Sequence, residues 1–402
     1  MKKVVQFIKS EIVLTVAVVL AVASMFFVHP DEAYLGYIDF RTLSILFCLM
    51  AVMAGFQEIG LFRLIAEKLL KKVSGVFGLV YILVMLCFFF SMLITNDVAL
   101  ITFIPFTFIV LQLLEEDLQK RLIIPVVVMQ TIAANLGSML TPIGNPQNLY
   151  LYGKAGYSFT EFMLLMLPYA AVAFVLLTVY CISLGSRRAS GEARRHFPVR
   201  GNLLRNRREK NQNTFNAISV AFAAETSLAG KEKAILRYVI LFGVSLLVVV
   251  RVIPYSVALG IVVLALALFD RRLFARIDYA LLFTFVGFFI FIGNMGRVPV
   301  FNGFLADVIE GNEVLTSVVA SQVISNVPAA LLLSGFTDNI RDLIIGTNLG
   351  GLGTLIASMA SLISYKFIAK SDKCNRGAYI RSFTVWNLIF LAVLLGAWML
   401  AA

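Results

Sequence analysis

Polar residues interrupt the apolar stretch of residues 91–148 in two places. Residues 91–100 read SMLITNDVAL, and residues 134–148 read ANLGSMLTPIGNPQN. Both runs put Asn, Thr, Ser, Gly and Pro into segments that are otherwise apolar enough to lie in hydrocarbon. Because backbone in lipid must satisfy its own hydrogen bonds, helix breaks at membrane depth persist only where they line a cavity or pack against protein. The two breaks therefore indicate a binding site inside a membrane protein.

The second half of the chain repeats both runs. Residues 321–330 read SQVISNVPAA, and residues 347–358 read TNLGGLGTLIAS. Four pairs of polar or small residues then align without a gap: Asn135 with Asn348, Gly137 with Gly350, Thr141 with Thr354 and Asn145 with Ser358. Paired interrupted segments at corresponding places in two halves point to the site of a transporter.

Composition places the chain in a membrane. Of its 402 residues, 60% are hydrophobic and 14% are charged, whereas soluble domains are about half apolar and about a quarter charged. The net charge of +11 would suggest nucleic-acid binding in a soluble protein. Here the excess Lys and Arg lies in loops, where the bias of cytoplasmic loops towards positive charge explains it. We therefore expect no nucleic-acid partner.

The sequence offers little for catalysis or metal binding. The four cysteines have no metal-ligand spacing, so neither a disulfide nor a transition-metal site is expected. The apolar segments contain no histidine, carboxylate pair or nucleotide-binding loop. The chain is therefore not expected to be an enzyme.

The hydropathy pattern predicts an all-α polytopic membrane protein with about nine spanning helices, two re-entrant hairpins and two interrupted helices. The break at Thr95-Asn96-Asp97 permits either two full spans or a re-entrant hairpin over residues 76–114. With both hairpins re-entrant and the N-terminus inside, every strongly basic loop is cytoplasmic, whereas one spanning hairpin would invert the loops beyond it. We expect a multi-pass protein of the plasma membrane, with its C-terminus outside.

Two oppositely oriented repeats are expected, separated by a basic polar stretch at residues 185–233. The first repeat, 1–184, contains the hairpin 76–114 and a broken helix over 122–150; the second, 234–402, contains the hairpin 314–336 and a broken helix over 342–365. The basic stretch is predicted to be a cytoplasmic linker, with a regulatory or partner-binding region as the alternative. Inverted repeats allow outward-open and inward-open states of similar energy.

Each hairpin tip offers the ends of two helices. The first limb ends with free carbonyls, which suit Na⁺ or another hard cation, and the second limb begins with free amides, which suit an anion. The predicted substrate-binding residues are Thr95, Asn96, Asp97, Asn145, Asn148, Ser325, Asn326, Thr354 and Ser358. The residues predicted to bind the coupling cation, Na⁺ or H⁺, are Thr95, Asn96, Asp97, Asn135, Gly137, Thr141, Ser325, Asn348, Gly350 and Gly353.

Asp97 has two interpretations. It caps the helix that it begins, or it is an intramembrane carboxylate with a function. An ionised Asp97 would repel a multivalent anion unless it is protonated or pairs with a bound cation. The residue therefore favours proton or cation coupling, or a substrate without a large negative charge.

These motifs resemble the ion transporter superfamily, which includes arsenite permeases, citrate-transporter-like proteins and the divalent anion:sodium symporters. The tripeptide Thr95-Asn96-Asp97, followed by residues 134–135 and 144–148, is similar to the arsenite-permease branch. The resemblance covers nearly the whole chain. It implies a scaffold region, a transport region that moves as a body with substrate between the two tips and, from the symporter branch, a homodimer. That branch has Ser-Asn-Thr at both tips, whereas the third positions here are Asp97 and Val327, which argues against a dicarboxylate.

The sequence predicts a secondary active transporter that moves a small inorganic or organic anion by alternating access, coupled to H⁺ or Na⁺. No cofactor is expected apart from Na⁺ as a coupling ion. The expected partners are the anion or metalloid substrate, the coupling cation and the lipid bilayer. Three alternatives stay open: an arsenite or metalloid efflux permease, a Na⁺/H⁺ antiporter that uses Asp97 and, from another class, an ion channel.

Overall fold

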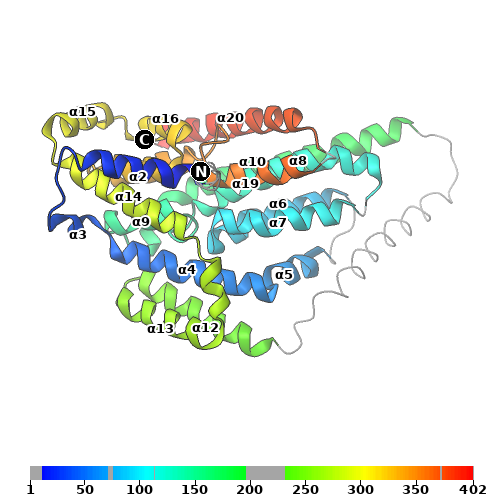
Figure 1. The fold of residues 1–402 in the computed structure, drawn as a ribbon. Coiled ribbons are helices and arrows are strands. Elements are labelled where there is room, and N and C mark those ends of the chain that lie inside the picture. The colour runs from blue at the N-terminus through cyan, green and yellow to red at the C-terminus, as the bar shows by residue number, and fades with distance from the viewer. Residues whose placement is uncertain (1–10, 71–75, 113, 196–230, 372–373, 402) are drawn as a thin grey trace, which may run out of the picture. The chain divides into compact units, whose positions relative to one another are not determined.

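The computed structural model describes residues 11–70, 76–112, 114–195, 231–371 and 374–401, and every regular element in these ranges is a helix (Figure 1). Six of the described helices are long and apolar enough to cross a membrane: α4 (Phe40–Ile59), α6 (Val76–Ile94), α8 (Glu116–Ser138), α10 (Phe159–Arg195, as far as Leu184), α14 (Tyr279–Gly296) and α20 (Arg376–Ala401). Shorter apolar helices accompany them: α2 (Ile12–Ser24), α7 (Asn96–Gln112), α13 (Tyr255–Phe269), α15 (Pro299–Ile309) and α16 (Glu313–Ile324). The predicted all-α polytopic membrane protein is confirmed.

The remaining elements are short or more polar. They are α3 (Ala33–Tyr37), α5 (Leu61–Leu70), α9 (Pro146–Ala155), α12 (Glu232–Val249), the 3-10 helix η1 (Arg271–Arg276), α17 (Asn326–Leu333), α18 (Ile340–Leu349) and α19 (Met359–Lys370). Both predicted hairpins therefore form pairs of helices, α6 with α7 and α16 with α17. Both predicted broken helices are interrupted, between α8 and α9 and between α18 and α19.

Several helices extend beyond their expected bounds, α8 and α10 among them. α8 begins at Glu116 rather than near residue 122, because Glu116 and Asp117 occupy its first turn, where acidic side chains stabilise the N-terminal end of a helix. Both carboxylates also form salt bridges with residues one turn further along the helix, Glu116 with Lys120 at 2.7 Å and Asp117 with Arg121 at 2.8 Å. α10 continues past residue 184 to Arg195, into the predicted basic linker. Residues 196–230 of that linker lie outside the described residues.

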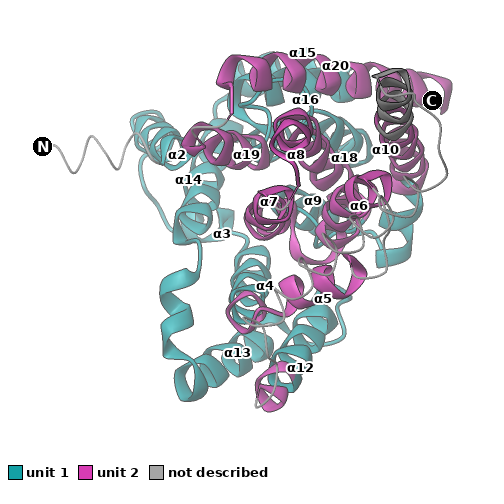
Figure 2. Cartoon of the chain, turned by 90° about the vertical axis from the view of Figure 1, so that its right-hand side faces the viewer, with its two compact units in different colours: residues 1–55, 141–165, 236–358 teal, residues 56–140, 166–235, 359–402 magenta. Residues whose placement is uncertain are grey.

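The helices gather into two compact units, and each unit takes elements from both halves of the chain (Figure 2). Unit 1 comprises residues 1–55, 141–165 and 236–358, and unit 2 comprises residues 56–140, 166–235 and 359–402. The boundaries at 140/141 and 358/359 fall inside the two helix breaks. Each broken helix therefore contributes one half to each unit.

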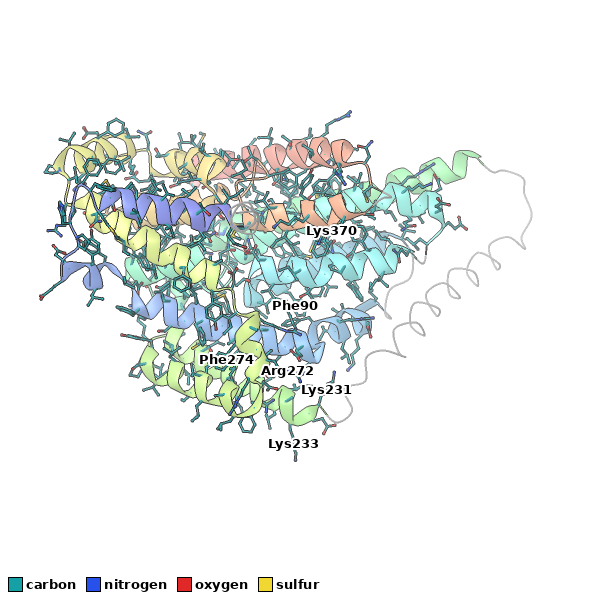
Figure 3. The ribbon with its side chains drawn as sticks, in the orientation of Figure 1. Phe90, Lys231, Lys233, Arg272, Phe274 and Lys370 are labelled. Atoms are coloured by element: carbon teal, nitrogen blue, oxygen red, sulfur yellow. The ribbon has the colours of Figure 1, made fainter. Side chains whose placement is uncertain are left out.

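Unit 2 is built around the first hairpin. α6 and α7 lie side by side and both pack on α8, while α19 packs on α7 and α8 (Figure 1). The ring of Phe90 on α6 (Figure 3) packs against Phe62 of α5 and Phe103 of α7, with centroid distances of 5.8 and 5.2 Å. Because lipid tails are as apolar as these side chains, close van der Waals packing and interhelical hydrogen bonds hold such helices together.

A glycine and a buried glutamine bring α8 against the hairpin. A Cβ on Gly137 would lie 2.0 Å from the carbonyl oxygen of Phe88, so no larger residue fits this approach of α8 to α6. The Nε2 of Gln130 donates to the carbonyl oxygen of Leu83 at 3.0 Å and to Oγ1 of Thr107 at 2.8 Å. α8 is thus bonded to both limbs of the first hairpin.

Unit 1 is built around the second hairpin. α16 and α17 pack on each other and on α18, and α9 packs on α17 and α18. Gly350, which follows α18, takes the role of Gly137, since a Cβ there would lie 2.6 Å from Oγ of Ser321. Elsewhere in the unit α14 packs on α2, and its Asn294 donates to the hydroxyls of Ser24 and Tyr34 at 2.9 and 2.8 Å.

The two units share one arrangement. Each contains a hairpin, the first half of the broken helix that follows it, and the second half of the broken helix from the other half of the chain. α9 begins at Pro146 and α19 at Met359, each the eleventh residue after the aligned Asn135 and Asn348. The similarity between the halves of the sequence therefore extends to helix bounds and packing partners. The opposite orientation of the two repeats stays a prediction.

Candidate functional site

One residue in an unusual conformation separates the limbs of the first hairpin. Thr95, between α6 and α7, has a φ of 70°, which is rare for a β-branched residue. The next residue, Asn96, is buried, and its Nδ2 donates to Oδ1 of Asn135 at 3.0 Å. Its own Oδ1 accepts from the backbone N–H of Asp97 at 2.9 Å. The tip is thereby fastened to the last turns of α8.

The second hairpin breaks at the aligned residue. Ser325, between α16 and α17, has a φ of 74° and a ψ of 154°, a region that glycine alone adopts freely. Its buried neighbour Asn326 donates its backbone N–H to the carbonyl oxygen of Ala357 at 3.0 Å. This tip is fastened to the loop between α18 and α19.

Strain marks both tips. Among the non-glycine residues that the structure describes, only Thr95, Ser325 and Arg251 have a positive φ. Each such conformation costs about 1–3 kcal/mol and persists only where the surrounding structure holds it. Strain of this kind is concentrated at ligand-binding and active sites. Its occurrence at aligned residues of the two hairpins indicates a shared role.

Three buried asparagines bind one another in unit 1. Asn348 of α18 donates from Nδ2 to Oδ1 of Asn148 at 2.7 Å, and its Oδ1 accepts from Nδ2 of Asn145 at 3.4 Å. Asn145 precedes α9, and Asn148 lies in its first turn. The N-terminal end of α9 is thus held against the last turn of α18. The aligned Asn135 in unit 2 accepts instead from its own hairpin tip.

Gln147, between these asparagines, is a residue that the sequence analysis missed. Its side chain is 1% exposed, and neither its Oε1 nor its Nε2 has a hydrogen-bond partner among the described residues; the Oδ1 of Asn145 also lacks one. A buried group left unpaired in this way costs about 1–3 kcal/mol, so these atoms are candidates for binding a ligand. The sequence does contain a signal for it: Gln147 and Asn145 put an amide side chain on each side of Pro146, at the start of a helix in an apolar segment.

The N-terminal ends of α9 and α17 adjoin the same part of unit 1. Asn145, before α9, binds Asn348, while Nδ2 of Asn326, in α17, lies 3.0 Å from the position of a Cβ on the nearby Gly351. The other ends of these helices are tied at Ser334, the C-cap of α17. Its Oγ lies 3.0 Å from the hydroxyl of Tyr150, and its carbonyl oxygen accepts from the ammonium of Lys154. The partial positive charges of two helix starts therefore act on one region.

Gln322 of α16 binds the loop that follows α18, and the sequence analysis missed it as well. Its Nε2 donates to the carbonyl oxygens of Gly350 and Leu352 at 3.0 and 2.9 Å, and its Oε1 accepts from the N–H of Thr354 at 2.8 Å. The aligned residue of the first half is Met92, so comparison of the repeats drew no attention to it. A glutamine inside an apolar hairpin limb was the signal.

The predicted site residues are divided between the units. Unit 2 brings together five of them at its hairpin tip and the adjoining turns of α8: Thr95, Asn96, Asp97, Asn135 and Gly137. Unit 1 holds the others at its own tip and helix breaks: Thr141, Asn145, Asn148, Ser325, Asn326, Asn348, Gly350, Gly353, Thr354 and Ser358. Asp97 is half-buried in the first turn of α7, Ser358 is buried, and Thr354 is exposed. That substrate and cation bind these residues stays a prediction.

Helical hairpins that break at polar residues, packed with broken helices in an apolar bundle, define a membrane transporter. The chain belongs to the citrate transporter family, whose family model (CitMHS) matches residues 4–363. The predicted membership of the ion transporter superfamily, and the transporter class in place of an enzyme, are thereby confirmed.

The chain is also similar to proteins named as transporters or as a membrane protein. The chain is 30% identical over 345 residues to an uncharacterized transporter of Methanocaldococcus jannaschii, a match that covers 84% of each protein. It is 28% identical over 346 residues to the inner membrane protein YbiR of Escherichia coli, covering 85% of this chain and 84% of the relative. A shorter match, 32% identical over 158 residues, covers 39% of this chain and 31% of the rice silicon efflux transporter LSI3.

Proposed function

We propose that the protein is a secondary transporter of the plasma membrane that carries a small anion by alternating access, coupled to H⁺ or Na⁺. The observation that carries this proposal is the pair of helix starts in unit 1. The N-terminal ends of α9 and α17 adjoin one region, beside the buried and unpaired polar atoms of Asn145 and Gln147. The partial positive charge of a helix start favours an anion.

The first hairpin tip supports coupling to a cation. Asp97 puts a half-buried carboxylate in the first turn of α7, next to the strained Thr95 and the buried Asn96. A proton or Na⁺ held there would offset the charge of Asp97 while an anion is carried. We assign the coupling cation to this tip, with Asn135 and Gly137 as neighbouring groups.

Transport of an undissociated oxyacid, the metalloid alternative, is the second candidate. Two of the three unpaired buried atoms, Oδ1 of Asn145 and Oε1 of Gln147, are acceptors. An acid that keeps its hydroxyl hydrogens would donate to them, whereas a fully ionised anion would not. A relative is named a silicon efflux transporter, and an uncharged acid also tolerates Asp97.

A ligand-stabilisation screen of the purified protein in detergent separates these candidates, because a ligand that binds the folded state raises the apparent melting temperature. Citrate, dicarboxylates, sulfate, phosphate, arsenite and silicate are each tested in NaCl and in choline chloride, at two pH values. Stabilisation by an ionised anion supports the first candidate. Stabilisation by arsenite or silicate under conditions where the acid is uncharged supports the second.

A negative screen is also informative. If Na⁺ and pH change the melting temperature and none of the acids or anions does, both candidates fail and the Na⁺/H⁺ antiporter takes their place. Flux of the stabilising compound into liposomes containing the protein then tests transport itself. Under the proposed coupling, a pH or Na⁺ gradient drives this flux, and Asp97→Asn removes the dependence on the gradient.

A further inference from the structure

The Nε2 of Gln322 lies among three backbone carbonyl oxygens of unit 1. It is 3.1 Å from the oxygen of Val318, 3.0 Å from that of Gly350 and 2.9 Å from that of Leu352. One oxygen belongs to α16 itself, and the other two belong to the loop after α18. An amide nitrogen carries two hydrogens, so it cannot donate a full hydrogen bond to all three oxygens at once. The three oxygens thus converge on a single nitrogen that cannot fully satisfy them.

The loop is shaped around this side chain. Gly353 has a φ of 110°, and a Cβ on it would lie 2.3 Å from Oε1 of Gln322. Thr354 binds Gln322 twice, with its N–H to Oε1 at 2.8 Å and its hydroxyl to the backbone carbonyl oxygen at 3.2 Å. The path of the loop past Gly353 thus depends on the glutamine that it encloses.

Converging backbone carbonyls in an unwound helix are the ligands that a transporter uses for a hard cation such as Na⁺. Gly350 and Gly353 were predicted to bind a cation for this reason. Here the point at which the oxygens converge is occupied by a nitrogen that is covalently part of α16. The carbonyl oxygens bind the partially positive N–H hydrogens of Gln322, where in a cation site they would coordinate the ion.

We infer that the amide of Gln322 replaces a cation in the second half of the chain, so that cation coupling is confined to the first hairpin. The inference rests on the proposed function, because it concerns the coupling ion of that transporter. Ser325, Asn348, Gly350 and Gly353 then keep a structural role without a bound cation. In the first half the aligned residue, Met92, has a thioether and no N–H donor in its side chain, so the first half has no amide at this position.

The test is the apparent melting temperature of the purified full chain, measured in NaCl and in choline chloride at equal ionic strength. Gln322→Glu replaces the donor with an oxygen, so that only oxygens face one another unless a cation enters. We expect this variant to melt about 5 °C or more below the wild type in choline and to regain most of the loss in NaCl.

Gln57→Glu is the matched control. Gln57 is also half-buried, and it donates from Nε2 to a side-chain hydroxyl, Oγ1 of Thr102, at 3.2 Å. We expect its response to Na⁺ to equal that of the wild type. Gln322→Met, which copies the first half, is the second variant in case the glutamate variant does not fold, and it should also gain stabilisation by Na⁺.

The first hairpin is tested with Gln322 intact. In Asp97→Asn the remaining carbonyl cluster is already occupied, so Na⁺ should give no stabilisation over choline. The inference is overturned if Gln322→Glu and Gln322→Met respond to Na⁺ no more than the wild type does, or if stabilisation by Na⁺ survives Asp97→Asn. None of these measurements uses a transported anion. Failure of the proposed anion function would appear separately, as a wild-type protein that no anion stabilises.

Discussion

Asn96 and Asn135 are joined by a hydrogen bond of 3.0 Å from Nδ2 to Oδ1, and both side chains are buried. Within unit 2 this bond fastens the first hairpin tip to α8. Asn135→Leu keeps a side chain of similar size but removes the acceptor of Asn96. We expect a loss of about 1–3 kcal/mol, because a buried donor is left without this partner. The apparent melting temperature in detergent measures the loss.

A double-mutant cycle isolates the bond. Asn96→Ala, Asn135→Ala and the double variant should be non-additive by about 0.5–3 kcal/mol, the range for residues in direct contact. Losses that simply add would show that the two asparagines act independently.

Gln147→Leu should stabilise the protein and impair transport. The substitution removes two buried polar atoms that have no partner among the described residues, and we expect a gain of about 1–3 kcal/mol from their removal. If these atoms serve the substrate, the same variant loses uptake or ligand-induced stabilisation. Gln130→Leu is the control, since its amide binds Leu83 and Thr107 and its loss should destabilise. A Gln147→Leu protein with normal transport would exclude Gln147 from the substrate site.

Thr95→Gly and Ser325→Gly should relieve backbone strain. The positive φ of both residues costs about 1–3 kcal/mol, and glycine removes this cost while adding about 0.5–1 kcal/mol of unfolded-state entropy. We expect a melting temperature equal to or above that of the wild type. Thr102→Gly, inside α7, has no strain to relieve and should destabilise. A fall at the tips as large as that at Thr102 would show that the tip conformations are unstrained.

Gly137→Ala should be strongly destabilising. The new Cβ would lie 2.0 Å from the backbone oxygen of Phe88 and 2.6 Å from Oγ of Ser91, and overpacking of this kind costs about 1–3 kcal/mol or more. Gly396→Ala, on α20, is the matched control because a Cβ there meets nothing within 4 Å. We expect the control to melt at the wild-type temperature or slightly above it, because alanine lowers the entropy of the unfolded chain. Equal melting temperatures for the two variants would contradict the close approach of α8 to α6.

Cys374 should report the predicted cytoplasmic side of the membrane. It lies between α19 and α20 and is half-buried, whereas Cys48, Cys87 and Cys181 are buried. A maleimide that cannot cross membranes should label Cys374 in inverted vesicles and not in intact cells, and Cys374→Ser should lose the label. Labelling from outside the cell would invert the predicted topology.

The pH dependence of this labelling follows from burial. Desolvation raises the pKa of the Cys374 thiol above its ordinary value. Because the thiolate is the reactive form, a raised pKa leaves less of it at neutral pH, and the labelling rate should increase as the pH rises through the alkaline range. A rate already constant above neutral pH would contradict the raised pKa.

Much of the fold could be predicted because helix breaks in a membrane are chemically conspicuous. The hairpins expected at 76–114 and 314–336 form as α6–α7 and α16–α17, and each turns at the first residue of a polar run, Thr95-Asn96-Asp97 or Ser325-Asn326. The division into units could not be predicted, since packing partners depend on side chains far apart in sequence. Nothing near Pro146 indicates that α9 packs on α17 and α18.

Comparison of the two aligned copies picked out residues that the structure brings together, and it passed over others that lie beside them. Asn96 and Asn135 appeared in matching positions and are bonded to each other. Gln147 and Gln322 have Ala360 and Met92 at the aligned positions, so the repeat comparison passed over both. Their importance lies in hydrogen-bond geometry, which residue types alone do not reveal.

The exchange of broken-helix halves has a consequence for how the chain is made. α9 packs on α17 and α18, and α19 packs on α7 and α8. During synthesis, α9 therefore leaves the ribosome long before α17 and α18 are made. The first hairpin likewise gains its contact with α19 only near the end of translation. The early segments must be held by lipid or by the insertion machinery in the meantime. A polypeptide truncated before residue 359 would lack α19, so unit 2 would be incomplete and α7 and α8 would each lose a packing partner.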